Sequence, residues 1–257
     1  MNLYIDRGAT YIRYQIENGN IITIEESDIV SLIRELTVKY NIKRAYISFA
    51  GEVRDNIIIS APNIDIERLD LSSYFPDIQF KIDNDLNCAV LAEAKYWSSR
   101  DIVALYIGTG IGAGAISSGD IVRGFSNLAG EIGHIPFKKA PFACGCGKDN
   151  CIELFTSGSA IKKWADYLNQ DFKRLEDMPQ EIYSEFLEGV LYASATLISL
   201  FNPQILVLGG GVIEKNSFLV EYIKQNIDRY AYNPNLKGLK IVQTKLKDAP
   251  LEGTKLL

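Results

Sequence analysis

The stretch from His134 to Cys151 constrains the fold of this chain most strongly, because it gathers the only histidine and three of the four cysteines within eighteen residues. One imidazole and three thiolates complete the tetrahedral ligand set of a structural zinc ion and leave no position for water or substrate. The alternative is that these are ordinary reduced cysteines of an intracellular protein, but their clustering around the lone histidine favours a metal. We therefore predict a structural zinc loop held by His134, Cys144, Cys146 and Cys151.

Composition excludes several classes of protein. The 257 residues suffice for one large domain or two lobes, and the 47% apolar and 23% charged residues are typical of a soluble globular protein. The net charge of -5, with scattered basic residues, argues against nucleic acid as a partner. No apolar run reaches the roughly 20 residues of a membrane span, and the chain does not begin like a signal peptide. Together with the clustered cysteines, these features predict a cytoplasmic protein.

Two similar hairpins about a hundred residues apart indicate an internal repeat. Leu3-Tyr-Ile-Asp-Arg-Gly-Ala-Thr10 precedes an alternating strand and a turn at Asn18–Ile21, and Leu105-Tyr-Ile-Gly-Thr-Gly-Ile-Gly112 precedes a second strand and a turn at Ser118–Ile121. Each copy predicts two hairpin-connected strands and a third strand. The repeat predicts an α/β chain of two lobes with a cleft between them. We place the N-terminal lobe at residues 1–98 and the C-terminal lobe, with the zinc loop, at residues 99–257; the tail can pack back on the first lobe.

Hydrophobic periodicity predicts the elements around these hairpins. Apolar positions at helical spacing predict helices over residues 27–40, 85–97, 180–201 and 214–229. Short apolar runs predict buried strands over residues 44–49, 80–83 and 205–208.

Three glycine-bearing turns follow strands, at residues 6–10, 108–114 and 209–211. Glycine lets backbone amides approach a phosphate closely. A single such turn is more often only a tight turn, but three in one chain favour a nucleotide held between the lobes. Gly-Lys-Ser/Thr does not follow, which excludes a Walker A loop, and the alternating glycines of residues 108–114 suit a hairpin rather than a Rossmann turn.

The segment Asp83-Asn-Asp-Leu-Asn87 lies where a strand gives way to a helix, a common place for active-site groups in α/β folds. An acidic residue beside bound ATP could accept a proton from an alcohol, while positioning and charge stabilisation supply most of phosphoryl transfer. The alternative is that Asp83 or Asn84 merely caps the helix.

These motifs together resemble the ROK family of sugar kinases and related repressors, within the actin-like ATPase superfamily with its ribonuclease H-like fold. The resemblance covers nearly the whole chain. Asp6-Arg-Gly-Ala-Thr10 and Gly108-Thr-Gly-Ile-Gly-Ala-Gly114 resemble the two phosphate motifs, and Asn84-Asp85-x-Asn87 resembles the catalytic motif. Residues 130–134 with 144–153 resemble the zinc and sugar signature, and residues 202–212 resemble the adenosine motif.

The resemblance implies an ATP-dependent kinase of a hexose or N-acetylhexosamine, which uses MgATP, carries structural zinc, is a homodimer and has no nucleic-acid or membrane partner. Asp85 is then the general base for the sugar hydroxyl. The residues implied to bind the sugar are Gly51, Asn84, Glu131, His134 and Glu153. Asp6 would organise Mg²⁺, and the other implied nucleotide contacts are Gly8, Thr10, Gly108, Thr109, Gly110, Gly209, Gly210 and Gly211.

Two departures from the family pattern leave a second hypothesis open. Ala9 stands where the family prefers a second glycine, and the loop after Pro62-Asn63 lacks the usual sugar lid. Both motivate a non-catalytic sugar or nucleotide sensor on the same fold. Retention of Asp85 favours the kinase, because a sensor needs no base.

Overall fold

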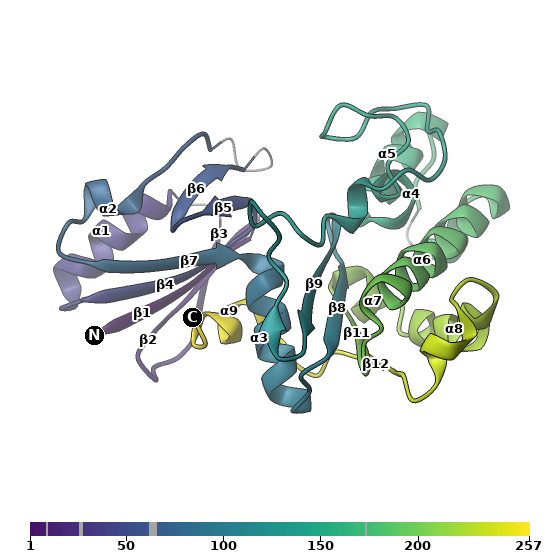
Figure 1. Cartoon of the computed structure of the whole chain (residues 1–257). Coiled ribbons are helices and arrows are strands. Elements are labelled where there is room, and N and C mark those ends of the chain that lie inside the picture. The colour runs from purple at the N-terminus through teal and green to yellow at the C-terminus, as the bar shows by residue number, and fades with distance from the viewer. Residues whose placement is uncertain (9, 26–27, 62–65, 173) are drawn as a thin grey trace. The chain divides into compact units, whose positions relative to one another are not determined.

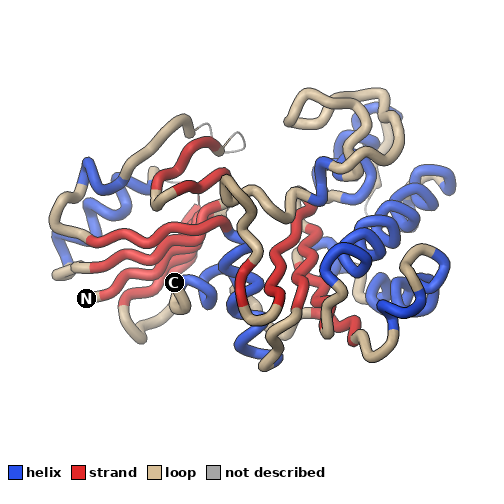
Figure 2. The backbone as a smooth tube through the Cα atoms, in the orientation of Figure 1, coloured by secondary structure: helices blue, strands red, loops and turns tan. Residues whose placement is uncertain are grey.

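The computed structural model describes residues 1–8, 10–25, 28–61, 66–172 and 174–257. Ala9 and the loop after Pro62, on which the two departures fall, therefore lie outside the described residues. The chain folds into two compact units. Unit 1 consists of residues 1–97, 123–129 and 246–257, and unit 2 of residues 98–122 and 130–245. The strands of each unit lie side by side in a sheet that helices flank, which confirms the predicted α/β architecture (Figures 1 and 2).

The sheet of unit 1 has the strand order β3-β2-β1-β4-β7. The first three strands are antiparallel, and β4 and β7 run parallel to β1. Their bounds are β1 (Asn2–Arg7), β2 (Tyr11–Ile16), β3 (Ile22–Glu25), β4 (Arg44–Phe49) and β7 (Gln79–Asn84), and β5 (Glu52–Arg54) pairs separately with β6 (Ile57–Ser60). Because side chains alternate along a strand, the register Asp6↔Ser48↔Asp83 places these three polar residues in one row on one face.

Helices cover both faces of this sheet. The helices are α1 (Ile29–Lys39), α2 (Leu71–Tyr74), α3 (Asp85–Trp97) and α9 (Ala249–Thr254). The apolar side of α1 joins strand residues such as Leu3 and Ile47 in a buried core, while α9 packs on β1, β4 and α3. An ideal Cβ on Gly253 of α9 would lie 1.8 Å from the carbonyl oxygen of Cys88 in α3, so only glycine permits this crossing.

The sheet of unit 2 repeats the same pattern with the order β10-β9-β8-β11-β12. Strands β8, β9 and β10 are antiparallel, and β11 and β12 are parallel to β8, so the predicted repeat is confirmed. The bounds are β8 (Ile102–Ile107), β9 (Ile111–Ser117), β10 (Asp120–Ile121), β11 (Ile205–Gly209) and β12 (Lys240–Gln243). Its α-helices are α4 (Glu153–Thr156), α5 (Gly158–Leu168), α6 (Gln180–Phe201), α7 (Gly211–Lys215) and α8 (Phe218–Asn226), and its single-turn helices are η2 (Ile132–His134), η3 (Leu175–Asp177), η4 (Ile227–Arg229) and η5 (Asn233–Leu236).

The prediction of a single helix over residues 214–229 was wrong. The chain forms α7, α8 and η4 instead. Asn216 breaks the run, because its side-chain amide donates to the carbonyl oxygen of Val212 at 2.8 Å and its backbone leaves helical geometry.

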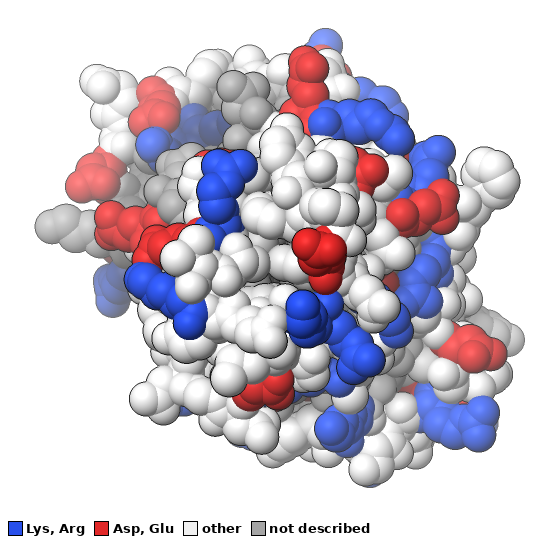
Figure 3. All heavy atoms as spheres, turned by 90° about the vertical axis from the view of Figure 1, so that its left-hand side faces the viewer, with Lys and Arg blue, Asp and Glu red and all other residues white. Residues whose placement is uncertain are grey.

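Two surface properties follow from the described residues. No helix among them is long and apolar enough to cross a bilayer. On the face drawn in Figure 3, Lys and Arg lie interspersed with Asp and Glu, in keeping with the scattered basic residues of the sequence.

Candidate functional site

The end of β7 in unit 1 is organised around the carboxylate of Asp83, which is only 5% exposed. Its Oδ1 accepts hydrogen bonds from the backbone N–H of Asn84 (2.8 Å) and from the side-chain amides of Asn87 (2.8 Å) and Asn127 (3.0 Å). Its Oδ2 accepts from Nε (3.1 Å) and Nη2 (2.8 Å) of Arg123. A buried carboxylate is tolerable only with such donors. The network therefore fixes the backbone directly before Asn84 and Asp85.

Asn84 and Asp85 stand at the junction of β7 and α3, which follow each other without a loop. The Oδ1 of Asn84 accepts from the backbone N–H of Leu86 (2.9 Å), and its Nδ2 donates to the carbonyl oxygen of Gly51 (3.2 Å). Asn84 thus caps α3, which was one of the alternatives considered from the sequence. Half-buried Asp85 begins α3 and accepts from Leu86 N–H at 3.0 Å.

Position 51 has space for glycine but not for a larger side chain. An ideal Cβ there would lie 2.6 Å from the carbonyl oxygen of Ser60 and 2.9 Å from the side chain of Ala61. The structure thus brings Gly51 and Asn84 of the predicted sugar set into contact.

The first phosphate motif contains a second buried carboxylate. Asp6 is 3% exposed, and it accepts from Ser48 Oγ at 2.9 Å and pairs with Arg13 Nη1 at 3.2 Å. Arg13 Nε also contacts Asp248 Oδ1 at 3.1 Å. Burial raises the pKa of Asp6, against the lowering effect of Ser48 and Arg13. Carboxylate oxygens are ligands that Mg²⁺ accepts, so the residues fit this ion provided that Arg13 gives up the oxygen that it holds.

The turn after Asp6 is described in part. The backbone N–H of Gly8 donates to the carbonyl oxygen of Tyr11 at 3.1 Å, and Thr10 is exposed.

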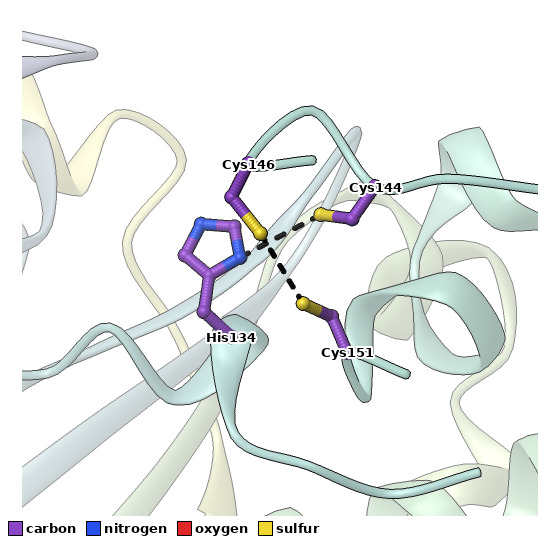
Figure 4. Close-up of side chains that lie close together, drawn as sticks. All are labelled: His134, Cys144, Cys146 and Cys151. Carbon is purple, nitrogen blue, oxygen red and sulfur yellow. Dashed lines mark hydrogen bonds between the residues drawn. The ribbon is translucent and has the colours of Figure 1, made fainter. Parts of the chain in front are cut away.

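The predicted metal ligands converge in unit 2. His134 ends η2, and the following loop returns along it through Phe137 N–H to Asn150 O (2.8 Å) and Ile152 N–H to Ile135 O (3.0 Å). The four ligand atoms, one each from His134, Cys144, Cys146 and Cys151, lie within 4.8 Å of one another (Figure 4).

The spacing of these atoms fits a tetrahedral ion. His134 Nδ1 lies 3.6 Å from Cys144 Sγ, and Cys146 Sγ lies 3.4 Å from Cys151 Sγ. Ligand bonds of about 2.0–2.3 Å around zinc place neighbouring ligand atoms roughly 3.6–3.8 Å apart. These two distances match a zinc site, and the 4.8 Å span of the whole set means that the remaining ligand atoms need to move by at most about 1 Å.

The thiol pKa values show what such an ion would supply. Burial raises the pKa of Cys151 to about 12 and also raises that of Cys144, whereas a backbone hydrogen bond from Lys148 lowers that of exposed Cys146. Cys144 and Cys151 thus stay protonated at neutral pH unless a cation stabilises their thiolates. A divalent metal does so.

Two acidic residues flank the metal loop. The carboxylate of Glu131, 52% exposed, lies 3.9 Å from His134 Nε2, the ring nitrogen that does not face the sulfurs. Glu153 begins α4; its Oε2 accepts from the backbone N–H of Ile111 at 3.3 Å, and its Oε1 lies 3.6 Å from Cys144 Sγ. The structure therefore places Glu131 beside His134, and Glu153 beside Cys144 of the same loop. That these residues bind a sugar stays a prediction.

The glycine turns of unit 2 lie at the ends of two neighbouring parallel strands, β8 and β11. Residues 108–110 close the β8–β9 hairpin, with Gly108 N–H donating to Gly110 O at 2.9 Å. Gly209 ends β11, and Gly210 has φ +89°, with an ideal Cβ 2.5 Å from Ile107 O. Gly211 has no described heavy atom within 4 Å of its ideal Cβ. These turns thus combine close backbone packing with an open position at Gly211.

Sequence reasoning missed Arg123 and Asn127. Both belong to the segment 123–129, which joins unit 1 although unit 2 flanks it on either side. Asn127 also donates to Val53 O at 2.9 Å. No spacing rule relates them to Asp83 across some forty positions, and only the fold reveals the pairing.

Comparison with known proteins identifies relatives of this chain. The model of the ROK family matches residues 13–257. An N-acetyl-D-glucosamine kinase of Aliivibrio salmonicida is 34% identical over 155 residues, which cover 51% of this chain and 51% of that protein. The chain spans about half the length of the first curated relatives that it matches.

Solved structures share the fold over nearly the whole chain. A ROK family glucokinase from Streptomyces griseus, in complex with glucose and AMPPNP, gives a TM-score of 0.78 at 22% identity and covers 98% of this chain and 97% of its own. A ROK family transcriptional regulator, the homologue of an E. coli protein, gives a TM-score of 0.81 at 21% identity and covers 99% of this chain and 76% of its own. With a family model that matches all but the first twelve residues, the chain belongs to the ROK family.

Proposed function

We propose that the protein is an ATP-dependent kinase that phosphorylates a hydroxyl of a hexose or N-acetylhexosamine. The observation that carries the proposal is the acid at the start of α3: Asp85 follows a backbone held by the Asp83 network and stands beside Asn84, which contacts Gly51. The names of the relatives support it, since they include an N-acetyl-D-glucosamine kinase and a glucokinase that binds glucose and an ATP analogue.

In this proposal Asp85 accepts the proton of the attacking sugar hydroxyl. A positioned carboxylate contributes typically 10²–10⁴-fold as a general base. Asp83 cannot take this role, because both of its oxygens already accept hydrogen bonds from Arg123, Asn87 and Asn127. Asp85 is half-buried at the first residue of α3, a position from which a base can reach a substrate.

The sugar is held by directional polar contacts from Gly51, Asn84, Glu131, His134 and Glu153. His134 serves two partners, since Nδ1 faces the metal loop and Nε2 is directed to Glu131. Zinc would supply a fixed orientation of this imidazole. The ring nitrogen that does not face the sulfurs would then hydrogen-bond a sugar hydroxyl.

The nucleotide is proposed to use Asp6, Gly8 and Thr10 of unit 1 and residues 108–110 and 209–211 of unit 2. Mg²⁺ bound with the nucleotide would neutralise charge on the β- and γ-phosphates. Asp6 is the residue proposed to orient it, and the glycine turns offer backbone N–H groups to phosphate oxygens.

One observation favours the alternative of a non-catalytic sensor. Arg13 holds Asp6 and Asp248 together, with N···O distances of 3.2 and 3.1 Å. A guanidinium beside the Asp6 carboxylate provides positive charge where the kinase proposal requires Mg²⁺. A sensor could bind sugar or nucleotide with this ion pair intact.

The two candidates are separated by an ADP-release assay with MgATP on glucose, mannose, fructose, N-acetylglucosamine and N-acetylmannosamine, with sugar binding measured in parallel by calorimetry. The kinase proposal expects at least one sugar to raise ADP release well above the level of the Asp85→Asn variant. Asp77→Asn, an exposed aspartate of unit 1, is the matched control and should behave as wild type. Sugar binding without sugar-dependent ADP release would establish the sensor.

A further inference from the structure

We infer that Glu153 is a positioning residue that joins the metal loop to the turn of residues 108–111, so that nucleotide binding by this turn depends on the metal. The inference deepens the proposed function, on which it rests for the identity of the ligand. It gives Glu153 a role that a contact with sugar does not include.

The carboxylate of Glu153 lies directly against the backbone of the turn. Its Oε2 accepts the hydrogen bond from Ile111 N–H at 3.3 Å, and an ideal Cβ on Gly110 would lie 2.7 Å from the same oxygen. An ideal Cβ on Gly133, just before His134, would lie 3.4 Å from it. The two glycines therefore leave the space that this carboxylate fills.

The other carboxylate oxygen faces the metal loop. Glu153 Oε1 lies 3.6 Å from Cys144 Sγ, and Glu153 follows the fully buried Cys151 by two residues. The carboxylate of Glu153 thus lies between a predicted metal ligand and the turn proposed to bind phosphate. Because a metal-bound thiolate has no proton to donate to Oε1, the link from the metal to Glu153 runs through the chain from Cys151.

A second connection runs from the backbone of Glu153 to the opposite side of the same turn. Ser157 Oγ donates to Glu153 O at 2.9 Å and accepts from Ala160 N–H at 3.0 Å, which caps α5. The first amides of α5 then hold the turn, with Gly158 N–H to Gly108 O at 2.8 Å and Ser159 N–H to Thr109 O at 3.0 Å. Displacement of the metal loop would therefore disturb both anchors of the turn.

The consequence is a dependence of the turn on both the metal and the carboxylate. Without a cross-link among the four ligands, residues 144–151 keep backbone hydrogen bonds such as Cys144 N–H to Lys148 O (2.7 Å) and Phe137 N–H to Asn150 O (2.8 Å), but their side chains are no longer tied to His134. A hydrogen bond to a charged group contributes about 1.5–3 kcal/mol, so its loss should weaken nucleotide binding by about tenfold or more. Glutamine at this position keeps an accepting oxygen and should retain most of the affinity.

The test combines amide hydrogen exchange with nucleotide affinity. Exchange over residues 108–111 is measured in zinc-loaded wild type, in chelator-treated protein, and in the Glu153→Ala and Glu153→Gln variants at equal zinc content. Glu131→Ala is the matched control, because Glu131 is also proposed to bind sugar but lies at the exposed side of His134. Affinity for a non-hydrolysable ATP analogue is measured without sugar. Exchange in α6 serves as the reference for global folding.

Faster exchange over residues 108–111 and weaker nucleotide binding are expected for Glu153→Ala and for chelated protein, while Glu131→Ala and Glu153→Gln stay near wild type. Unchanged exchange and affinity in Glu153→Ala would overturn the inference and confine Glu153 to the sugar. If chelation unfolds α6 as well, the zinc-loaded Glu153→Ala protein decides the question. If the wild type binds no nucleotide, the proposed function fails, but the exchange of residues 108–111 still tests the positioning role.

Discussion

The two sheets have the same topology but place different chemistry at the ends of corresponding strands. In unit 1 the order is β3-β2-β1-β4-β7, and in unit 2 it is β10-β9-β8-β11-β12. In both units the parallel strand next to the first strand is followed or ended by a glycine. Gly51 follows β4 in unit 1, and Gly209 ends β11 in unit 2. The outer parallel strands differ, since β7 leads into Asp83–Asp85 whereas β12 ends at Gln243. At the ends of the first strands, unit 1 therefore carries the carboxylate of Asp6 where unit 2 has the glycine turn of residues 108–110, and only unit 1 has carboxylates at the end of its outer parallel strand.

The difference shows two ways of fixing polar groups on one scaffold. Unit 1 holds buried Asp6 and Asp83 through hydrogen bonds from side chains on several segments, including residues 123–127. Unit 2 holds its polar residues through a metal loop and through the carbonyls of a glycine turn. The first arrangement depends on many weak contacts, and the second would depend on the predicted zinc centre. Substitutions should therefore act differently in the two units.

The largest effect is expected from loss of the metal centre. Cys144→Ser should abolish zinc binding, because it removes one of the four ligands. The effect should be large, since structural zinc contributes roughly 10–16 kcal/mol of binding free energy in small zinc domains. Metal analysis should find about one zinc per wild-type chain, and limited proteolysis should then cut the variant between residues 135 and 150. The matched control is Cys88→Ala in unit 1, which should keep its zinc. Zinc loss in the control, or retention in Cys144→Ser, would contradict the assignment of ligands.

The second prediction separates the units by their effect on catalysis. Asp85→Asn keeps size but accepts no proton, so turnover should fall by roughly 10²-fold or more while sugar affinity changes little. Glu131→Gln in unit 2 should instead raise KM with a smaller effect on kcat, since it removes a binding contact. Steady-state kinetics with the best sugar of the panel measure both. Equal losses in kcat and in affinity for the two variants would remove the distinction.

The third prediction concerns the glycines of the β11–α7 turn. Gly210→Ala should lower the free energy of unfolding by about 2 kcal/mol or more, because it combines a left-handed φ with a close approach to Ile107 O. Gly211→Ala is the matched control, with open space at its ideal Cβ among the described residues, and should stay within about 0.5 kcal/mol of wild type. Urea unfolding of both variants measures the difference. A similar cost for the two would show that Gly210 does not need its conformation.

Local patterns in the sequence predicted the parts of the site that a short stretch contains. His134 and the three cysteines lie within one loop, and the junction of Asn84 and Asp85 needs only one strand and one helix. The hairpins followed from alternating residues and turn signals for the same reason. Arg123 and Asn127 could not be predicted, because their partner Asp83 is set by tertiary folding. The break at Asn216 was missed because apolar spacing continues across it and only a side-chain bond to Val212 ends the helix.

The smallest effect is expected from the loss of a helix cap, and each unit offers one such cap. Asp28 caps α1 of unit 1, where its carboxylate accepts from Val30 N–H at 3.3 Å and from the N–H of Ser31 at 2.9 Å. Ser157 caps α5 of unit 2 through Ala160 N–H. Partial burial raises the pKa of Asp28, but its bonds with Ser31 and Val30 outweigh burial and lower it below the ordinary value of 3.8. Replacement of either cap by alanine should cost about 1 kcal/mol at pH 7.

Only the Asp28 cap should depend on pH. A depressed pKa in the folded state stabilises the protein above the ordinary value of 3.8, and this contribution is lost as pH falls through the lower folded value. The cost of Asp28→Ala should therefore shrink between pH 5 and pH 3, while that of Ser157→Ala should stay constant. Trp97 lies in unit 1 and Trp164 in unit 2, so urea unfolding followed by fluorescence in Trp164→Phe and Trp97→Phe backgrounds reports on each unit. A cost of Asp28→Ala that is constant with pH would show that the carboxylate charge contributes nothing to the cap.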